Sequence, residues 1–141
     1  MKILVIGYGS IGKRHISNLS KIGRIEIIVL TKRKKDSFLK KNNCQVFSKL
    51  EDCLNETPVA AIICNETSFH INTASKLIKK NIHIFIEKPI SNSLTGIKEI
   101  KQIIKSKKII THVGCVQRFH PVMKKTRKII EKKSIGKIKF L

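Results

Sequence analysis

Residues 3–12 of the sequence read Ile3-Leu4-Val5-Ile6-Gly7-Tyr8-Gly9-Ser10-Ile11-Gly12. Its apolar half is typical of a buried strand, and a helical pattern follows it. In such a strand-turn-helix unit the first glycine permits a tight turn, and the second lets a pyrophosphate approach the backbone. The third glycine lets the helix pack closely against the sheet. We therefore predict a dinucleotide-binding turn, with free N–H groups and a partial positive charge at the start of the helix.

The same glycines could form a purely structural turn, because the chain has 7 glycines and the motif alone is weak. Its position favours cofactor binding, since the motif follows a predicted buried strand and opens an amphipathic helix. We expect Ile11, Leu19 and Ile22 to share the apolar side of that helix.

Short apolar runs alternate with helical patterns along the rest of the chain. This alternation is typical of the α/β class, and it predicts a doubly wound parallel (Rossmann) sheet with helices on both faces. Strands are expected at residues 2–6, 26–30, 45–47, 60–64, 83–86 and 109–113. The clearest helices are expected at residues 68–80, 93–106 and 121–133.

The chain has 141 residues, which suits one domain with a single core, and we assign residues 1–133 to the Rossmann domain. Residues 137–141 then alternate polar and apolar side chains, as a strand with one buried face does. This strand could pair with the edge of the Rossmann sheet, or it could begin a second domain.

Composition excludes several classes of protein. No apolar run approaches the ~20 residues that a membrane span needs, and the N-terminal apolar segment is too short for a secretory signal. We therefore expect a cytoplasmic protein. The four cysteines, Cys44, Cys53, Cys64 and Cys115, show neither C-x-x-C nor histidine-paired spacing, so we expect no metal site and no disulfide framework.

The formal net charge of +21 raises the possibility of nucleic-acid binding. However, the lysines are spread over the whole chain in short runs, as on solvated faces. The chain has one tyrosine and no tryptophan, and no aromatic residues are interleaved with the basic ones to stack on bases. A basic nucleic-acid-binding protein is therefore the least favoured interpretation.

Three segments follow later strands at the carboxyl edge of the predicted sheet, where such folds bind ligands. They are Cys64-Asn65-Glu66-Thr67-Ser68-Phe69-His70, Glu87-Lys88-Pro89 and the run from Gly114 through Arg118-Phe119-His120-Pro121. Together with the glycine turn, which continues to His15, these segments resemble those of the Gfo/Idh/MocA family of NAD(P)-dependent oxidoreductases. The resemblance covers essentially the whole chain.

The resemblance implies that Lys88 is the active-site lysine. Its ammonium would hydrogen-bond a substrate hydroxyl or carbonyl and stabilise oxyanion charge during hydride transfer. It also implies a cis peptide bond before Pro89. The alternative interpretation of Lys88 is that it is a solvent-exposed lysine with no role in catalysis. The implied cofactor-binding residues are Gly7, Tyr8, Gly9, Ser10, Ile11, Gly12, Cys64, Asn65, His70, Glu87, Lys88 and Arg118. Arg118 could instead pair with an acid, and His15 could have a packing role.

The end of the second predicted strand bears on the choice of cofactor. NAD enzymes usually place an acid there, on the ribose 2′-hydroxyl. Here Leu30 is followed by Thr31-Lys32-Arg33-Lys34-Lys35, whose hydroxyl and cationic groups suit a 2′-phosphate. We therefore add Thr31, Lys32 and Arg33 to the cofactor-binding residues and expect NADP to be preferred over NAD, although the basic run could be a generic surface cluster.

Members of the family are more than twice as long, and their second α/β domain binds the substrate, completes the acid–base machinery and forms the oligomer interface. We therefore expect residues 134–141 to begin a truncated C-terminal domain, leaving the chain catalytically incomplete alone. The resemblance implies hydride transfer between NAD(P) and a hydroxyl or carbonyl of a sugar-like substrate. The alternative is an NADP(H)-binding regulatory or partner-dependent module without catalysis.

Overall fold

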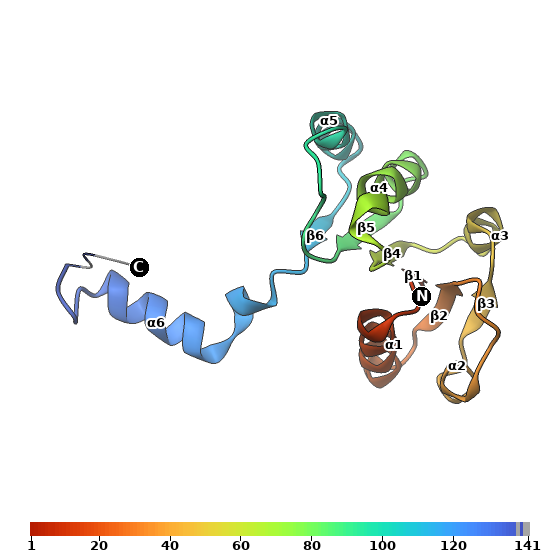
Figure 1. Ribbon diagram of the computed structural model, residues 1–141, viewed down its shortest axis with the longest axis horizontal. Coiled ribbons are helices and arrows are strands. Elements are labelled where there is room, and N and C mark those ends of the chain that lie inside the picture. The colour runs from red at the N-terminus through yellow and green to blue at the C-terminus, as the bar shows by residue number, and fades with distance from the viewer. Residues whose placement is uncertain (138, 140–141) are drawn as a thin grey trace.

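A computed structural model describes residues 1–137 and residue 139, and its centre is a six-stranded sheet (Figure 1). All neighbouring strands are parallel, in the order β3-β2-β1-β4-β5-β6. The strands are β1 (Lys2–Ile6), β2 (Glu26–Leu30), β3 (Gln45–Phe47), β4 (Ala60–Ile63), β5 (His83–Ile86) and β6 (Thr111–Val113). This strand order confirms the predicted doubly wound sheet, in which the winding reverses between β1 and β4.

The chain has six helices and two 3₁₀ turns among its described residues, and five of the helices cover the two faces of the sheet. The helices are α1 (Ser10–Ile22), α2 (Ser37–Lys41), α3 (Leu50–Asn55), α4 (His70–Lys79), α5 (Ile97–Lys107) and α6 (Pro121–Glu131), with 3₁₀ turns η1 (Thr67–Phe69) and η2 (Val116–Phe119). Figure 1 shows α1 and α2 on one face, α3, α4 and α5 on the other, and α6 standing away from the sheet.

Side chains that alternate along the central strands form two core layers. Ile3 and Val5 of β1 pack with the helices of the α1 face, whereas Leu4 and Ile6 pack with those of the α4 face. Successive strand residues point to opposite faces, so a continuous apolar run is what a strand covered on both sides requires. This requirement explains why the bounds of β1 could be predicted from sequence.

The predicted apolar face of α1 is correct for Leu19 and wrong for Ile11 and Ile22. Ile11 is 39% exposed and Ile22 is 70% exposed. The buried residues are instead Gly12, Ile16 and Leu19. The spacing of four and three residues places these side chains on one face of the helix. Because the helix packs through Gly12, which has no side chain, the apolar pattern alone predicted a face that shares Leu19 with the buried one but is rotated away from it.

The predicted helix at residues 93–106 begins later than expected, at Ile97. Ser93 Oγ accepts a hydrogen bond from the Thr95 backbone N–H at 3.1 Å, and Gly96 lies in the left-handed region with φ 78°. Side-chain bonds to the nearby backbone favour a turn over a helix.

The expected strand at residues 137–141 includes residues 138, 140 and 141, which lie outside the described residues, so it stays a prediction. In the part of the chain that the structure does describe, no helix combines the length and the apolar character that crossing a membrane demands.

Candidate functional site

A cleft of about 750 Å³ lies at the carboxyl edge of the sheet, where β1 has β2 on one side and β4 on the other. This is the point at which doubly wound sheets bind ligands. The residues that line the cleft come from the ends of four strands and the segments that follow them: Ile6, Gly7, Tyr8, Gly9, Leu30, Thr31, Lys32, Arg33, Ser48, Leu50, Cys64, Asn65, Glu66 and Phe69.

The three glycines of the turn have different surroundings. Gly7 has φ +104°, and a Cβ there would lie 2.6 Å from backbone atoms of Cys64 and Asn65. A Cβ on Gly12 would lie 2.0 Å from the Gly7 carbonyl oxygen, so Gly12 brings α1 against the turn. A Cβ on Gly9 would meet nothing within 4 Å, because Gly9 borders the open cleft.

The start of α1 faces the same cleft. The helix begins after Gly9, with no side chain capping its first N–H groups and no acidic residue in its first turn. Unpaired N–H groups and the helix dipole together attract an anion such as a phosphate. Residues 7–12 therefore have both the space and the charge that a pyrophosphate requires.

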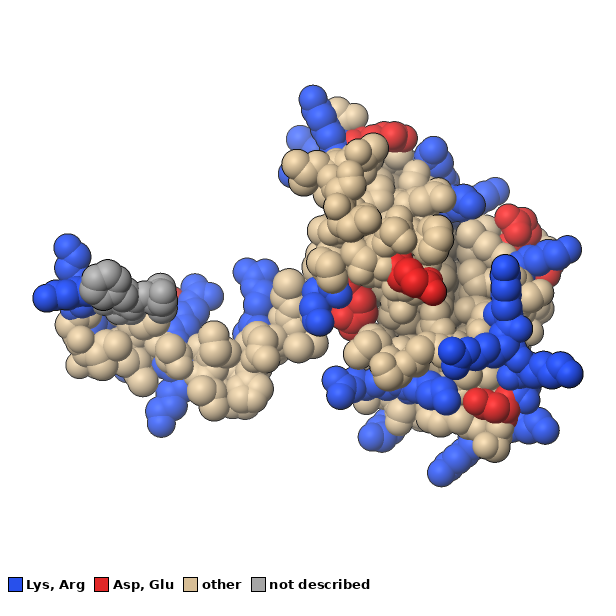
Figure 2. Space-filling model, viewed as in Figure 1, with Lys and Arg blue, Asp and Glu red and all other residues tan. Residues whose placement is uncertain are grey.

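One wall of the cleft is basic. Thr31, Lys32 and Arg33 follow β2 and line it, and the Arg33 backbone N–H donates to Thr31 Oγ1 at 3.1 Å. Figure 2 shows that Lys and Arg side chains project from most of the visible surface, with acidic ones at a few places between them. Positive charge is therefore spread over the visible surface, but the basic residues that line the cleft, Lys32 and Arg33, both lie on this wall.

The first acidic residue after β2 is Asp36, and its carboxylate accepts hydrogen bonds from Tyr8 and Leu39. Tyr8 Oη donates to both of its oxygens at 2.8 Å, and the Leu39 backbone N–H donates to it at 3.0 Å. The Leu39 N–H is the main cause that lowers the pKa of Asp36, followed by the Tyr8 hydroxyl. Burial, with Asp36, raises the pKa of Tyr8. Tyr8 thus ties the glycine turn to the loop after β2.

The opposite wall comes from the segment after β4. Cys64 Sγ donates to the carbonyl oxygens of Ile6 and Gly7, at 3.2 and 3.3 Å. Asn65 Nδ2 donates to Thr73 Oγ1 at 3.4 Å. His70 lies behind this wall and is only 1% exposed.

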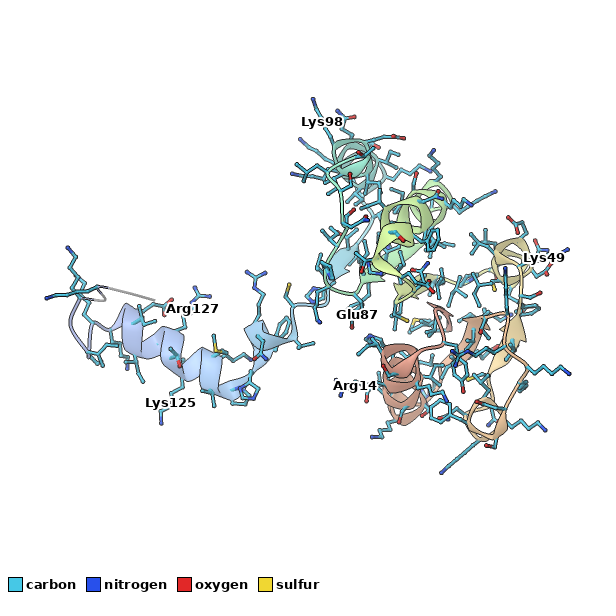
Figure 3. All side chains as sticks on the ribbon, in the orientation of Figure 1. Arg14, Lys49, Glu87, Lys98, Lys125 and Arg127 are labelled. Carbon is cyan, nitrogen blue, oxygen red and sulfur yellow. The ribbon has the colours of Figure 1, made fainter. Side chains whose placement is uncertain are left out.

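Glu87 and Lys88 follow β5 at the same edge of the sheet, outside the residues that line the cleft. Figure 3 labels Glu87. Glu87 Oε1 lies 2.8 Å from His15 Nε2 of α1, and Glu87 Oε2 accepts from the Lys88 backbone N–H at 3.2 Å. Lys88 is exposed, and the Lys88-Pro89 peptide bond is cis, as the resemblance implies. Arg118 is exposed on η2.

The structure thus gathers eight of the predicted residues on one cleft: Gly7, Tyr8, Gly9, Thr31, Lys32, Arg33, Cys64 and Asn65. Ser10, Ile11 and Gly12 form the adjoining first turn of α1. Sequence reasoning did not assign the other six lining residues to the cofactor: Ile6, Leu30, Ser48, Leu50, Glu66 and Phe69. Ser48 could have been found, because it follows β3 at the same edge of the sheet. The position of Phe69 depends on the 3₁₀ turn before α4.

The cysteines are expected to differ in reactivity. Burial raises the pKa of Cys53 to about 11 and that of Cys64 to about 12, and it also raises the pKa of Cys44, whereas Cys115 is exposed. Since the thiolate is the nucleophile, a pKa of about 12 leaves roughly one thiol in 10,000 reactive at pH 8.

We expect iodoacetamide to modify Cys115 alone in the folded chain, as measured by peptide mass spectrometry. All four should react in concentrated guanidinium chloride. Rapid modification of Cys64 in the folded chain would contradict this burial.

Comparisons with known proteins agree with this geometry. A family model described as "Oxidoreductase family, NAD-binding Rossmann fold" matches residues 1–115. An uncharacterized oxidoreductase of Bacillus subtilis, YrbE, is 31% identical over 94% of this chain and 40% of its own length. The myo-inositol 2-dehydrogenase of Thermotoga maritima is 30% identical over 97% of this chain and 42% of its own length. The chain therefore spans about 40% of the length of these relatives.

Solved structures share the fold. The crystal structure of myo-inositol 2-dehydrogenase from Lactobacillus plantarum superimposes with a TM-score of 0.86 at 24% identity, covering 98% of this chain and 43% of that one. The scyllo-inositol dehydrogenase of Lactobacillus casei, whose structure contains NAD(H) and scyllo-inositol, gives a TM-score of 0.85 at 23% identity with the same coverage.

Proposed function

This chain belongs to the Gfo/Idh/MocA oxidoreductase family, and we propose that its cleft binds NADP(H) for hydride transfer to or from a sugar-like polyol. The observation that supports the cofactor most directly is the glycine turn at residues 7–12 beside the uncapped start of α1. The proposal for the substrate draws on the inositol dehydrogenases among the relatives. We propose residues 1–133 as the cofactor-binding domain and residues 134–141 as the start of a further α/β domain.

The residues present fit a dinucleotide. The cleft volume of about 750 Å³ lies within the ~300–1,000 Å³ typical of small-molecule sites. Gly9 leaves the turn open where a pyrophosphate would approach, and the first turn of α1 would donate backbone N–H groups to it. The adenosine half would then lie along Thr31 and Arg33, and the nicotinamide half along Cys64 and Asn65.

We assign the preference for NADP over NAD to the wall after β2. Thr31 and the two basic residues after it line the cleft, and the nearest following acid, Asp36, is held by Tyr8 and Leu39. A 2′-phosphate would gain charge-assisted hydrogen bonds from this wall. A ribose 2′-hydroxyl would find no carboxylate on it.

Lys88 is the proposed catalytic residue. A bound nicotinamide supplies the hydride donor or acceptor. The ammonium of Lys88 would hydrogen-bond the reacting oxygen of the substrate and stabilise the negative charge that develops there when a carbonyl is reduced. Glu87 restrains the loop from which Lys88 projects, because it accepts from the Lys88 N–H while His15 holds its other oxygen.

Calorimetric titration with NADPH and NADH tests the cofactor assignment, and the double variant Lys32→Glu/Arg33→Glu tests its cause. We expect the variant to bind NADPH about tenfold or more weakly, because two attractive charges beside the 2′-phosphate become repulsive. NADH binding should change less than NADPH binding. The matched control reverses Lys98 and Lys101 on α5 instead, giving the same net charge away from the cleft (Figure 3). Failure of the folded chain to bind either nucleotide would refute the proposed function.

A further inference from the structure

The buried histidine behind the cleft links two loops of the site. His70, the first residue of α4, is 1% exposed and is the one buried polar side chain among the described core residues. Its Nδ1 lies 3.0 Å from the Pro89 carbonyl oxygen, and its Nε2 lies 3.0 Å from the Asn65 carbonyl oxygen. A carbonyl only accepts, so a neutral ring, which carries one N–H, can donate to one of these carbonyls, and donating to both requires the doubly protonated ring.

The two carbonyls belong to segments that follow neighbouring strands. Asn65 follows β4 and lines the cleft, whereas Pro89 follows β5 and is the residue after Lys88. The Lys88-Pro89 unit is thus contacted on both sides, since Glu87 accepts from the Lys88 N–H at 3.2 Å and His70 Nδ1 lies at hydrogen-bond distance from the Pro89 carbonyl oxygen. Asn65 is fixed by the same imidazole.

We propose that His70 is a positioning residue that sets the nicotinamide half of the site without touching the dinucleotide. Both of its ring nitrogens are used by backbone carbonyls, and its side chain is buried, so neither nitrogen is free to bind a ligand. Its effect passes through Asn65 on the cleft wall and Lys88 in the adjoining loop. The inference rests on the proposed function, and it assigns to His70 a role different from direct cofactor contact.

A histidine that merely filled space would act differently from one that positions two loops. A general loss of packing would weaken the binding of every ligand of the domain, or it would lower only the free energy of unfolding. If His70 positions the nicotinamide end, its loss should weaken the binding of NADPH but not the binding of a fragment that lacks nicotinamide. The two roles therefore separate when the same variants are titrated with NADPH and with 2′-phospho-ADP-ribose.

The test compares His70→Leu, which fills similar space without donors, with two amide variants. The side-chain nitrogen of asparagine lies near the position of Nδ1, so His70→Asn can keep the bond to Pro89. That of glutamine lies near Nε2, so His70→Gln can keep the bond to Asn65. We expect His70→Leu to weaken NADPH binding about tenfold and binding of the fragment less than about twofold, with partial rescue in both amide variants.

The matched control is His83→Leu. His83 opens β5 at the opposite end of that strand, where its Nδ1 accepts from the Ile110 N–H at 3.1 Å, so the change also removes one bond from a histidine. It should leave the affinity ratio of the two ligands unchanged. Circular dichroism verifies folding, and if His70→Leu does not fold, the two amide variants provide the comparison.

The outcomes are distinguishable. The positioning role would be overturned if the His70 variants lost the same fraction of their affinity for both ligands, or if they lost none of their affinity for NADPH. Either result would leave the proposed cofactor site intact. If the unmodified chain bound neither ligand, the proposed function would fail and this inference with it.

Discussion

Gly9→Val is expected to abolish measurable NADPH binding while the chain stays folded. A Cβ at Gly9 meets no atom within 4 Å, so a side chain that starts there enters open space, and we expect the folded protein to accept valine. The space that it would fill is the cleft beside the uncapped start of α1, which is where the proposed pyrophosphate lies. We expect the affinity to fall by at least about 100-fold, or roughly 2.7 kcal/mol.

Calorimetric titration measures this loss, and thermal unfolding followed by circular dichroism shows that the fold is retained. The backbone of Gly9 is extended, with φ −92° and ψ −166°, which suits a β-branched residue. Gly9→Ala adds one carbon to the same space and should weaken binding by an intermediate amount. Unchanged NADPH affinity in Gly9→Val would show that the dinucleotide does not lie on this turn.

The scaffold of the site could be predicted from sequence because local patterns determine it. Continuous apolar runs identify strands that are covered on both faces, as Ile3-Leu4-Val5-Ile6 does, and parallel strands bring the segments after them to one edge. The positions of Thr31 and Asn65 on the cleft followed from that rule alone.

The partners of these residues could not be predicted, because they depend on three-dimensional packing. Tyr8 donates to Asp36, 28 residues away, and the carboxylate that it holds is not among the residues that line the cleft. His15 meets Glu87 across 72 residues. The periodicity of a single sequence does not indicate such pairs. Tyr8 could therefore be placed in the glycine turn, but the hydrogen-bond partner of its hydroxyl could not be predicted.

Gly12→Ala is expected to destabilise the fold although it lies in a helix. Alanine has the higher helix propensity by about 1 kcal/mol, so a solvent-exposed glycine here would predict a gain in stability. However, the new Cβ would lie 2.0 Å from the Gly7 carbonyl oxygen, a separation that no side-chain rotation can relieve. Moving α1 away would separate Ile16 and Leu19 from the core layer on that face of the sheet. We expect the cost of overpacking to exceed the propensity gain and to lower the free energy of unfolding by about 2 kcal/mol.

Thermal unfolding measures this effect as a fall in Tm of roughly 5–10 °C for a domain of this size. Gly9→Ala is the matched control, because it adds the same atom three residues earlier in open space. Gly9 is the N-cap of α1, where alanine is less favourable than glycine by up to about 1 kcal/mol, so we expect a smaller fall in Tm than for Gly12→Ala. The two substitutions would then separate the functions of the glycines: Gly12 allows α1 to contact the turn, and Gly9 keeps the turn open to its ligand. A higher Tm in Gly12→Ala would mean that α1 does not pack against Gly7, and it would remove the structural basis for placing the start of α1 at the cleft.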